Sequence, residues 1–586
     1  MSDTSRNLSR RKFIAAGSAA IAAPIVMNMA GKVSETKAAE KSYDFVDKKS
    51  CDFVVLGGGG SGLVAAIRAA QLSGKKVIVL EKDSVAGGGA QGARTMRTFR
   101  SKWQAKRNLK DTTVEYANRM MDFLFWRVDP ELITNCLLGT GQFFDWACEL
   151  GGNIEDKFSE GIYKLSEDEN LDIEPIGPQL ENQAMGKNFG GFMTDLMREK
   201  SKTFGVEILT GHPVVDVEVK DGKIIAAIAK SDKGFVRVAC KACVLATGSW
   251  ISNKELLEKY APEYAEAKQY MKLSGMPSGA SGGQGGAPGG QGGASSGMSR
   301  NVGHESPNYT GDGVPLAEKV GAFVDYGSFC LRMMGGTVSA GNSKVVSAMG
   351  VLPFTISVNL NGKRYCSEPV SRMGIFAGAH ILLDQPHAQT FTIFDQNNLA
   401  AALEFQKCVN AGGKCTPVKM IAVMSAMSGE KSSLPDTMEE MQSDLAKSSA
   451  IKADTLEELA DKMGVNKKTF LETVKAYNEA CATGSDMQVY KSKEYLVPIN
   501  KGPFYAAQSH YMHDGAFGGV RVNPEMQAYK ADRKTLVEGL YVAGDFATGR
   551  HVSLNGMKRQ VINDLAWAFS SGFLAGTNVA RYLQTI

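Results

Sequence analysis

Short apolar runs flank one longer Ala-rich segment near the start of the chain. Residues 51–83 read CDFVVLGGGGSGLVAAIRAAQLSGKKVIVLEKD. FVVL and VIVL are uninterrupted apolar runs of strand length, and the Ala-rich segment between them has the length of a helix. A cluster of glycines separates the first run from that segment. The pattern therefore predicts a strand, a glycine turn, a helix and a second strand.

The glycines of this turn stand in GxGxxG register at Gly57, Gly59 and Gly62, and Glu81 ends the second strand 19 residues after Gly62. Glycines let a backbone approach a pyrophosphate at a helix N-terminus, and an acid at this distance suits a ribose hydroxyl. The alternative is a glycine-rich loop without a ligand, but strand, helix and acid are all in place. The candidate cofactor-binding residues of this segment are Gly57, Gly59, Gly60, Ser61, Gly62, Glu81 and Lys82.

Two later segments also predict strands. Residues 205–248 alternate apolar and polar positions, contain an Asp-Gly hairpin signal at Asp221, and end in ATG. Residues 535–549, TLVEGLYVAGDFATG, predict a strand that closes on Gly544 and Asp545.

Two segments predict helices in the second half of the chain. Residues 454–484 have the pattern of two amphipathic helices, with Asp454 and Asn466 as their N-caps. A further helical stretch is expected from Asn555 onward.

Composition excludes one class of partner. The chain has 586 residues, of which 43% are hydrophobic, so it can bury a large core in more than one domain. Its formal charge is +4, but residues 1–39 hold six cations and two acids, which leaves 60 of each sign in the rest. A near-neutral chain does not indicate a nucleic-acid partner.

The first residues resemble a twin-arginine export signal. SRRKFIAAGSAAIAAPIV places Arg10 and Arg11 before an Ala-rich run that is too short and too weakly apolar to span a bilayer. We expect residues 1–39 to be a signal cleaved between Ala30 and Ala39, the protein to be periplasmic or otherwise extracytoplasmic, and its contact with the export machinery to be transient. The alternative is the basic terminus of a cytoplasmic protein.

The cysteines do not indicate a metal or haem site. Cys240 and Cys243 form a CxxC motif, but the surrounding FVRVACKACVLATGS predicts a strand, on which positions three apart face opposite sides. The chain has no CxxCH motif, so we expect no c-type haem of its own.

A Gly-rich insert at residues 274–298 interrupts the chain and lacks the apolar side chains needed to order it. Its SGAS, residues 278–281, matches a site for covalent FMN attachment, but such a tetrapeptide arises by chance in a Gly/Ser tract.

The pair of VVLGGGGSGL with Glu81 and the later LYVAGD resembles the two halves of a glutathione-reductase-type FAD-binding domain. The motif order, with NGKRYCSEPVSR between YTGDG and AGD, is similar to that of the fumarate reductase and succinate dehydrogenase flavoproteins, especially exported soluble fumarate reductases. The resemblance implies an α/β fold: a Rossmann-like FAD-binding domain split into residues 48–330 and 503–586, with an α+β capping domain at 331–502. It also implies FAD, held without a covalent bond, and adds these cofactor-binding candidates: Val214, Ala246, Thr247, Gly248, Asp312, Gly544 and Asp545.

The resemblance also assigns the chemistry of the stretch at residues 362–372, GKRYCSEPVSR. In the family an arginine four residues after a glutamate delivers a proton to one carbon of a double bond, and here Glu368 and Arg372 keep that spacing. Lys363 and Arg364 are expected to shape the loop. The remaining catalytic candidates, as polar groups for anchoring or proton transfer, are Tyr511 and His513. The alternative for Arg372 is a surface arginine in a turn.

Several departures from the family argue against fumarate as the substrate. A histidine expected before a GG pair is replaced by Gly515 and Ala516, a carboxylate-binding arginine is replaced by Gly556, and a second histidine is missing where the chain has two methionines. Each lost charge-assisted bond is worth about 1.5 to 3 kcal/mol. We expect a more apolar pocket, which suits an enoate, enone or aryl alkene. Its candidate lining residues, each of which could equally be ordinary core, are Met333, Met334, Phe517 and Met557.

The sequence therefore predicts an exported FAD-dependent reductase of an activated carbon–carbon double bond. Its electrons are expected from a separate donor, a cytochrome being the natural candidate, because the only nucleotide fingerprint is assigned to FAD. Three alternatives stay open: a desaturating dehydrogenase of the 3-ketosteroid type, a non-catalytic FAD electron-transfer subunit, and an amine or amino-acid oxidase. Glu368 and Arg372 favour reduction.

Overall fold

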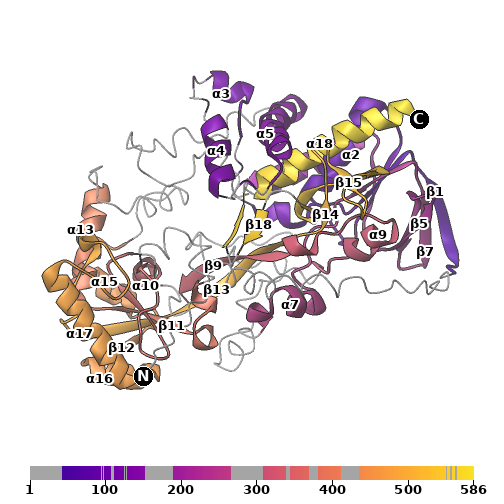
Figure 1. Ribbon diagram of the computed structural model, residues 1–586. Helices are drawn as coiled ribbons and strands as arrows, with labels where there is room; N and C mark the ends of the chain where they lie inside the picture. Colours follow the sequence, from indigo (N-terminus) through magenta and orange to yellow (C-terminus); the bar gives the residue numbers. More distant parts are fainter. Residues whose placement is uncertain are drawn as a thin grey trace, which may run out of the picture. The chain divides into compact units, whose positions relative to one another are not determined.

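The protein is described by a computed structural model (Figure 1). The structure describes residues 42–93, 96, 98–106, 108, 111, 113–123, 126, 128–151, 189–265, 308–337, 343–350, 352–368, 381–410, 434–548, 551–554, 557–560 and 564–586. The expected export signal, the Gly-rich insert with its SGAS tetrapeptide, and Arg372 lie outside these residues.

A six-stranded sheet forms the centre of the FAD-binding fold, and it joins distant parts of the sequence. Its order is β15 (Gln527–Tyr529), β16 (Leu536–Val542), β8 (Ala242–Leu245), β2 (Phe53–Leu56), β3 (Val77–Leu80) and β4 (Glu207–Leu209). The last five strands pair in parallel, and β15 runs antiparallel at the edge. β2, β3 and β8 are buried throughout, which explains their uninterrupted apolar runs. The prediction of an α/β fold split in sequence is confirmed.

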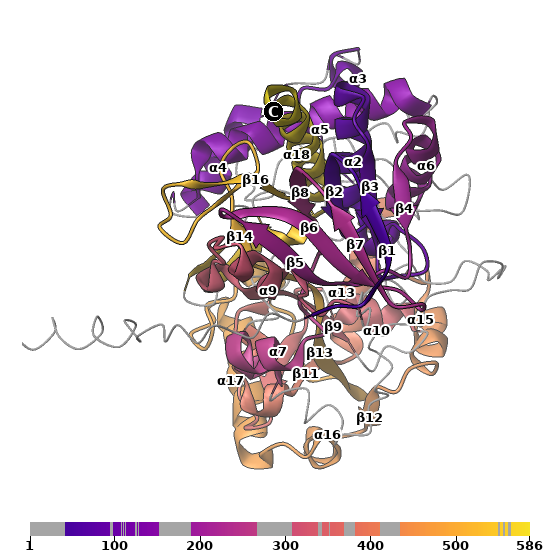
Figure 2. The ribbon, with the colours of Figure 1, turned by 90° about the vertical axis from the view of Figure 1, so that its right-hand side faces the viewer.

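Helices cover one face of this sheet, and a second sheet packs against the other (Figure 2). The helices are α2 (Gly60–Ser73), α5 (Pro130–Gly151), α6 (Phe189–Thr203) and α18 (Asp564–Thr585); the second sheet has the order β1 (Phe45–Ser50), β7 (Phe235–Ala239), β6 (Lys223–Lys230) and β5 (Val214–Lys220). α2 and α18 pack closely because α18 carries glycines at the contact. A Cβ on Gly572 would lie 2.3 Å from the Ser61 carbonyl oxygen. The remaining elements of this part are α3 (Lys102–Lys106), α4 (Thr113–Phe123), α7 (Lys254–Tyr260), α9 (Gly313–Lys319), β14 (Val520–Arg521) and β17 (Ala547–Thr548).

The strands predicted over residues 205–248 are present, with one difference. Asp221 and Gly222 connect β5 to β6 with φ of 54° and 73°, as the Asp-Gly signal predicted. The CxxC segment, however, is not one strand: β7 ends at Ala239 and β8 begins at Ala242 in the other sheet. Cys240 and Cys243 are both buried, and burial raises the pKa of each thiol. The described residues contain no group of acids, histidines and cysteines that could hold a metal ion.

The helix predicted from Asn555 onward is wrong at its start. β18 (His551–Leu554) and β19 (Met557–Gln560) form an antiparallel pair, and α18 begins only at Asp564. Lys558 and Arg559 therefore lie on a strand. The physical reason is the Asn-Gly dipeptide between the paired Leu554 and Met557, the strongest short-range signal for a two-residue hairpin connection.

An α+β region is built from the middle of the chain together with one later strand. Its five-stranded sheet has the order β10 (Ile356–Asn359), β11 (Thr390–Phe394), β13 (Phe504–Phe517) and β12 (Ile451–Ala453), and β9 (Cys330–Thr337) also pairs with β13. Its helices are α10 (Lys344–Met349), α13 (Gln396–Asn410), α15 (Met438–Leu445), α16 (Leu456–Met463) and α17 (Lys467–Thr483). Two apolar clusters fill the core of this region, one on each face of the sheet formed by β10, β11 and β13. The domain boundaries proposed from the sequence stay predictions.

The two helices predicted over residues 454–484 are present, but one cap differs. Asn466 caps α17 by accepting the Thr469 N–H, as predicted. α16 is capped by Thr455 rather than Asp454. Thr455 Oγ1 accepts the Glu458 N–H at 3.1 Å while the Glu458 carboxylate accepts the Asp454 N–H at 3.0 Å, so a reciprocal capping box fixes the start.

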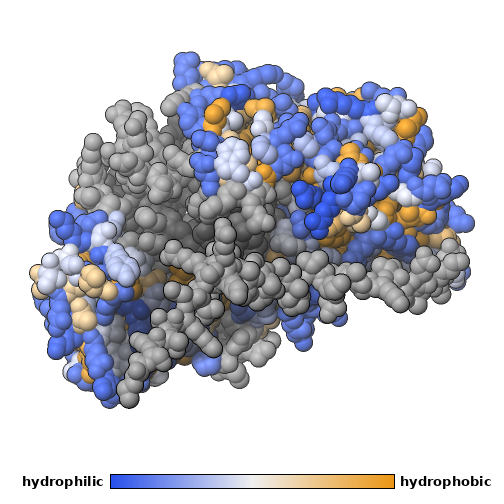
Figure 3. Space-filling model, in the orientation of Figure 1, coloured by the Kyte–Doolittle hydropathy of each residue, from blue (hydrophilic) through white to orange (hydrophobic). Residues whose placement is uncertain are grey.

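None of the helices among the described residues combines the length and apolar character needed to cross a membrane. On the face shown in Figure 3, polar residues predominate over the described surface, and apolar residues occur in small groups.

Candidate functional site

The glycine turn between β2 and α2 is closely packed on one side. Gly57 has φ of +102°, and a Cβ there would lie 2.3 Å from the Ala246 carbonyl oxygen at the end of β8. A Cβ on Gly62 would lie 2.0 Å from the Gly57 carbonyl oxygen. Side chains at these two positions would force the strand ends apart, so the glycines allow β2, β8 and α2 to meet.

On the other side of the same turn, the described residues leave space beside Gly59. A Cβ on Gly59, the N-cap of α2, would have no described atom within 4 Å, and no described side chain caps the helix. The first N–H groups of this 14-residue helix therefore have no side-chain cap among the described residues, and they lie at the positive end of the helix. Gly57 and Gly62 pack tightly against the strand end and the turn, while Gly59 has space beside it. This is the arrangement that a bound diphosphate needs.

Glu81 lies at the end of β3 beside this turn, with 7% of its surface exposed. Its carboxylate accepts the Gly58 N–H at 2.6 Å through one oxygen and the Asp83 N–H at 2.8 Å through the other. Burial raises the pKa of Glu81, and these two hydrogen bonds offset only part of that shift. Each carboxylate oxygen keeps a lone pair that a ribose hydroxyl can use.

Lys82 and Asp312 join two ends of the site. Lys82 Nζ contacts Asp312 Oδ2 at 2.8 Å and Thr310 Oγ1 at 3.0 Å, and Thr310 donates to Asp312 Oδ1 at 2.5 Å. Asn253 Nδ2 donates to the Thr310 carbonyl oxygen at 3.0 Å. The residues after β3 are thus tied to the residue that precedes α9.

The C-terminal motif meets the same turn. Gly544 has φ of +72°, and a Cβ there would lie 2.5 Å from Ser61 Oγ. The Gly544 N–H donates to Ser571 Oγ at 2.9 Å, and Trp567 Nε1 donates to the Gly544 carbonyl oxygen at 2.8 Å. α18 therefore fixes the half-buried Asp545 next to the N-terminus of α2.

Thr247 contributes a buried hydroxyl to this site. Its buried Oγ1 has no hydrogen-bond partner among the described residues. A Cβ on Gly313 would lie 2.2 Å from it, so the glycine makes room for the hydroxyl. Gly248 follows with φ of +73° and open space beside it. A buried hydroxyl without a partner is costly, and a bound dinucleotide with many acceptors and hydroxyls would satisfy it.

The structure gathers the predicted cofactor-binding residues at the carboxyl edge of the central sheet, where ligands of such sheets bind. Val214 lies close by at the start of β5, because the preceding Gly211 and His212 donate to the carbonyl oxygens of Asp83 and Glu81. The residues present thus fit FAD: the open turn can receive its diphosphate, Glu81 its ribose, and Thr247 one of its polar atoms.

Tyr309 was not singled out from the sequence, although it stands within the YTGDG motif. Burial raises its pKa, and so do the carboxylates of Asp545, Asp83 and Glu81. Its hydroxyl lies 2.8 Å from the position of a Cβ on Gly89. Tyr309 therefore stays a neutral phenol, which can donate a hydrogen bond.

Of the catalytic candidates, Arg372 lies outside the described residues and Glu368 is fully buried. Both Glu368 oxygens are engaged by the Arg364 guanidinium, at 3.0 Å from Nε and 2.8 Å from Nη2. Burial lowers the pKa of Arg364, but the carboxylates of Glu368 and Asp486 raise it by more than burial lowers it, so the net shift is upward. Arg364 thus holds the loop around Glu368, whereas Lys363 is exposed.

Tyr511 and His513 lie on β13, opposite Gly335 and Met333 of β9. Met512 pairs with Met334, and a register shift falls between His513 and Gly515. Bulges of this kind recur next to active sites, where they redirect side chains. β19, which begins at Met557, packs next to β9. The backbone therefore brings the predicted pocket residues onto neighbouring strands; the side chains of β9, of β19 and of residues 510–515 lie outside the description.

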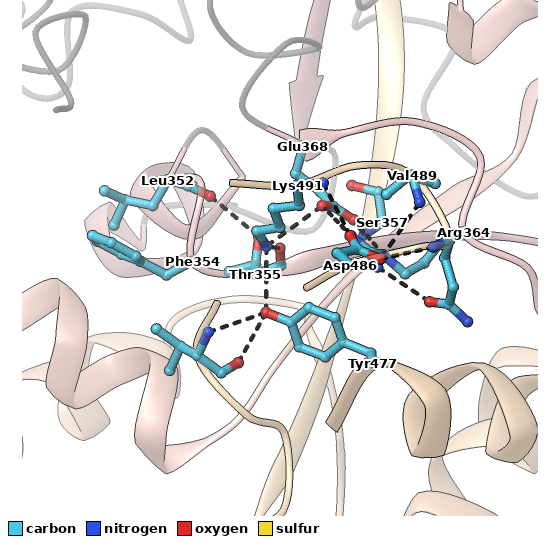
Figure 4. A network of polar contacts seen from close by, with 12 residues as sticks. Leu352, Phe354, Thr355, Ser357, Arg364, Glu368, Tyr477, Asp486, Val489 and Lys491 are labelled. Atoms are coloured by element: carbon cyan, nitrogen blue, oxygen red, sulfur yellow. Dashed lines mark hydrogen bonds and ion pairs between the residues drawn. The ribbon is translucent and has the colours of Figure 1, made fainter. Parts of the chain in front are cut away.

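Two charged residues near Glu368 could not be found from the sequence. Lys491 Nζ lies 3.4 Å from Glu368 Oε2, and Asp486 Oδ2 lies 2.9 Å from Arg364 Nη1 (Figure 4). More than a hundred residues separate each from its partner. No local motif marks either residue, and only folding reveals the pairing.

A model of the family described as FAD binding domain matches residues 52–297 and 301–560. Among curated proteins, the chain is 24% identical to NADH:fumarate oxidoreductase of Klebsiella pneumoniae over 94% of this chain and 50% of the relative. It is 24% identical to vinyl phenol reductase of Lactiplantibacillus plantarum, over 91% of this chain and 97% of the relative. It is also 24% identical to fumarate reductase (cytochrome) of Shewanella frigidimarina, over 95% of this chain and 81% of the relative. The chain thus spans only half of the first of these relatives.

Two solved structures show the same fold. One is the open conformation of a flavocytochrome c3 fumarate reductase, with a TM-score of 0.59 and 20% identity over 91% of this chain and 79% of that chain. The other is 3-ketosteroid-Δ4-(5α)-dehydrogenase of Rhodococcus jostii, with a TM-score of 0.60 and 22% identity over 93% of this chain and 99% of that chain. The glycine turn, the split sheet and the family match agree on FAD as the cofactor. The chain belongs to the FAD-binding domain family and, within it, to the fumarate reductase and succinate dehydrogenase flavoproteins.

Proposed function

We propose that the protein is an exported FAD-dependent reductase of an activated carbon–carbon double bond in an enoate, enone or aryl alkene, and that fumarate is not its preferred substrate. The observation that carries this proposal is the register of β9 and β13, which pairs Met333 with His513 and Met334 with Met512. Methionines stand on adjacent strands where the family's dicarboxylate reductases need groups that bind carboxylates. A thioether-rich site favours a larger and less charged substrate.

Names of further relatives support a substrate of this kind. Besides the reductases of fumarate and vinyl phenol, the similar proteins include an NADH:acrylate oxidoreductase, a urocanate reductase and a digoxin reductase. Beside the fumarate reductases, the similar proteins thus include four that are named for substrates other than a dicarboxylate.

Bound FAD would supply the hydride for such a reaction, and the chain must supply binding, orientation and a proton. Arg372 is the proposed proton donor. Because an arginine side chain has an unperturbed pKa above about 12, its advantage is placement beside the substrate rather than easy deprotonation. The described loop before it is held by the Arg364–Glu368 ion pair, which gives that placement a fixed starting point.

Electrons would come from a separate donor, for which a cytochrome is the natural class. The sequence has no CxxCH motif, and one relative is named fumarate reductase (cytochrome). Export through the twin-arginine pathway to an extracytoplasmic compartment is supported by Arg10 and Arg11. The proposed capping role of the α+β region would exclude water during the reaction.

The test is oxidation of reduced viologen by the purified FAD-loaded protein, with fumarate, urocanate, cinnamates, vinyl phenols and steroid enones as acceptors. We expect at least one aryl alkene or enone to be reduced faster than fumarate, and Arg372→Ala to abolish that activity while FAD stays bound. Fumarate as the fastest acceptor would contradict the proposed substrate class. Full activity of Arg372→Ala would contradict the proposed proton donor.

A second candidate function is dehydrogenation of a saturated ketone, which the similarity in fold to a 3-ketosteroid dehydrogenase favours. This reaction would be recognised by reduction of a dye with a saturated ketosteroid as the donor. A non-catalytic FAD carrier would turn over none of these compounds, and an amine or amino-acid oxidase would release peroxide in air.

A further inference from the structure

The backbone around Tyr309 is fixed by the side chains on either side of it. The preceding Asn308 donates from Nδ2 to Asp83 Oδ1. The following Thr310 accepts a hydrogen bond at Oγ1 from Lys82 Nζ at 3.0 Å. Asp83 and Lys82 both stand directly after β3, so the loop that carries Tyr309 is bonded to the segment that follows this strand.

The Tyr309 hydroxyl reaches the residues that adjoin the glycine turn. Its oxygen lies 2.8 Å from the position of a Cβ on Gly89, so the absence of a side chain at residue 89 makes room for it. A Cβ on the neighbouring Gly88 would lie 3.1 Å from the Gly59 Cα, and Gly59 forms a parallel β-bridge with Gly87. The hydroxyl thus stands one residue along the chain from the contact with Gly59, where the described residues leave space for a diphosphate.

In the described part of the chain, the Tyr309 hydroxyl has no hydrogen-bond partner. Its ring packs against the apolar core of the FAD-binding fold, and the side chain is only partly exposed. By contrast, the Tyr541 hydroxyl of the same fold donates to the Asn578 carbonyl oxygen at 3.4 Å. A phenol in such surroundings has lost hydrogen bonds to water, and a bound ligand that accepts a hydrogen bond would replace them.

The charged groups that act on Tyr309 are negative. Burial raises its pKa most, and the carboxylates of Asp545, Asp83 and Glu81 raise it further. The cation next to Glu81 in sequence, Lys82, is already held by a carboxylate at 2.8 Å. A diphosphate brings more negative charge to these carboxylates, and like charges repel. It therefore needs hydrogen-bond donors that the carboxylates do not capture.

We propose that Tyr309 is a cofactor-binding residue whose hydroxyl donates a hydrogen bond to the FAD diphosphate, so that this phenol and the first N–H groups of α2 bind the anion without a positively charged side chain. A neutral phenol suits this place because a lysine or arginine there would form ion pairs with the neighbouring carboxylates. A hydrogen bond to a charged oxygen is also about twice as strong as one between neutral groups. The inference concerns the cofactor and holds for whichever alkene the protein reduces.

The first test is fluorescence titration of the apo-protein with FAD, comparing Tyr309→Phe with the wild type. We expect the Kd for FAD to rise by about tenfold to a hundredfold, because a hydrogen bond to a charged oxygen is lost while the ring is kept. The melting temperature of the apo-protein should stay the same or rise, because the variant removes a hydroxyl that has no partner among the described residues. An unchanged Kd would overturn the proposal.

Two measurements locate the hydrogen bond on the diphosphate. ADP carries the same diphosphate without the flavin, so Tyr309→Phe should weaken ADP, used as a competitor of FAD, by the same factor as FAD itself. The phosphorus NMR signals of bound FAD should also shift between wild type and variant. Weaker binding of FAD with unchanged binding of ADP would assign the hydroxyl to the flavin half of the cofactor and overturn the diphosphate contact.

The matched control is Tyr541→Phe. Tyr541 is a buried tyrosine of β16, and its hydroxyl contacts α18 rather than the glycine turn. This variant should lower the melting temperature slightly, because it loses a hydrogen bond, and it should leave the Kd for FAD unchanged. An equal loss of FAD affinity in Tyr541→Phe and Tyr309→Phe would reduce Tyr309 to a packing role.

A second variant displaces the hydroxyl while the tyrosine is kept, in case Tyr309→Phe folds poorly. In Gly89→Ala the new Cβ would lie 2.8 Å from the hydroxyl oxygen of Tyr309 but 3.7 Å from the Cζ that carries it. The methyl group therefore fits beside a phenylalanine at residue 309 but not beside the tyrosine. Gly89→Ala should weaken FAD binding severalfold in the wild type and add nothing in Tyr309→Phe, since two changes to one contact are not additive.

The outcomes of these experiments are independent of the proposed function. Wild-type affinity for FAD in both Tyr309→Phe and Gly89→Ala would overturn this inference, even if an aryl alkene or enone is reduced faster than fumarate. Additive losses in the double variant would overturn it as well. Weakened and non-additive binding would uphold it, even if fumarate is the fastest acceptor and the proposed substrate class fails.

Discussion

The Glu81 carboxylate accepts the backbone N–H of Gly58 at 2.6 Å, so the acid that ends β3 is bonded to the turn that follows β2. The contact places a buried carboxyl group next to the N-terminus of α2, and burial raises the pKa of Glu81. FAD binding should therefore depend on the protonation of this one carboxyl group.

Affinity for FAD should rise with pH. The folded pKa of Glu81 lies above its ordinary value of 4.5, so between these two values the folded apo-protein holds a proton that the unfolded chain releases. Protonation of Glu81 therefore stabilises the folded apo-protein as the pH falls through this window, and this stabilisation is lost as the pH rises. A ribose hydroxyl donating to the carboxylate favours the ionised form, so FAD should bind more tightly above the folded pKa of Glu81 than below it.

The measurement is fluorescence titration of apo-protein with FAD from about pH 5 to about pH 8. Glu81→Gln should bind FAD about tenfold or more weakly at the upper end, because a charge-assisted hydrogen bond is lost. The variant should also show a flatter pH profile than the wild type. An unchanged pH dependence in Glu81→Gln would assign the effect to another group.

The two glycines of the turn should respond differently to alanine. A Cβ on Gly62 would meet the Gly57 carbonyl oxygen at 2.0 Å, so Gly62→Ala should lower stability by about 3 kcal/mol and also abolish FAD binding. A Cβ on Gly59 would meet no described atom within 4 Å. Gly59→Ala should therefore leave the melting temperature of the apo-protein unchanged and lower FAD content alone.

Absorbance of the bound flavin and thermal unfolding of the apo-protein separate these two effects. Gly205→Ala is a control for any general cost of adding a methyl group at a glycine with open space, with the difference that its φ of +66° adds backbone strain. Full FAD content in Gly59→Ala would show that the diphosphate does not lie over this glycine.

Local patterns predicted the elements that hold FAD, because their signals are contained within a few residues of each other. The strand, turn, helix and strand over residues 53–80 and the hairpin at Asp221 are of this kind. The same reasoning failed where two local signals competed. At Asn555 a helical pattern competes with an Asn-Gly turn signal, and the turn prevails. At α16 the predicted cap Asp454 is wrong, because Thr455 rather than Asp454 accepts the Glu458 N–H.

The buried ion pairs around Glu368 were beyond prediction for a different reason. Arg364 and Glu368 are close in sequence, but Asp486 and Lys491 join them through a turn that follows α17. Nothing in the residues around Asp486 indicates a buried pair rather than a solvated one. Pairing of this kind depends on the order of strands in the sheet, which apolar periodicity does not determine.

Thr247 provides a test of cofactor fit that works without catalysis. Its buried hydroxyl has no partner among the described residues, so Thr247→Val removes an unsatisfied polar group and keeps the shape of the side chain. The melting temperature of the apo-protein should stay the same or rise. FAD affinity should fall by about tenfold, because one hydrogen bond to the cofactor is lost. The neighbouring Gly248 has no side chain that could replace this bond. The measurement is calorimetric titration of apo-protein with FAD, with Thr98→Val as the control for a buried threonine whose hydroxyl contacts Gln104 instead. Equal FAD affinity of Thr247→Val and the wild type would mean that the hydroxyl faces no atom of the cofactor.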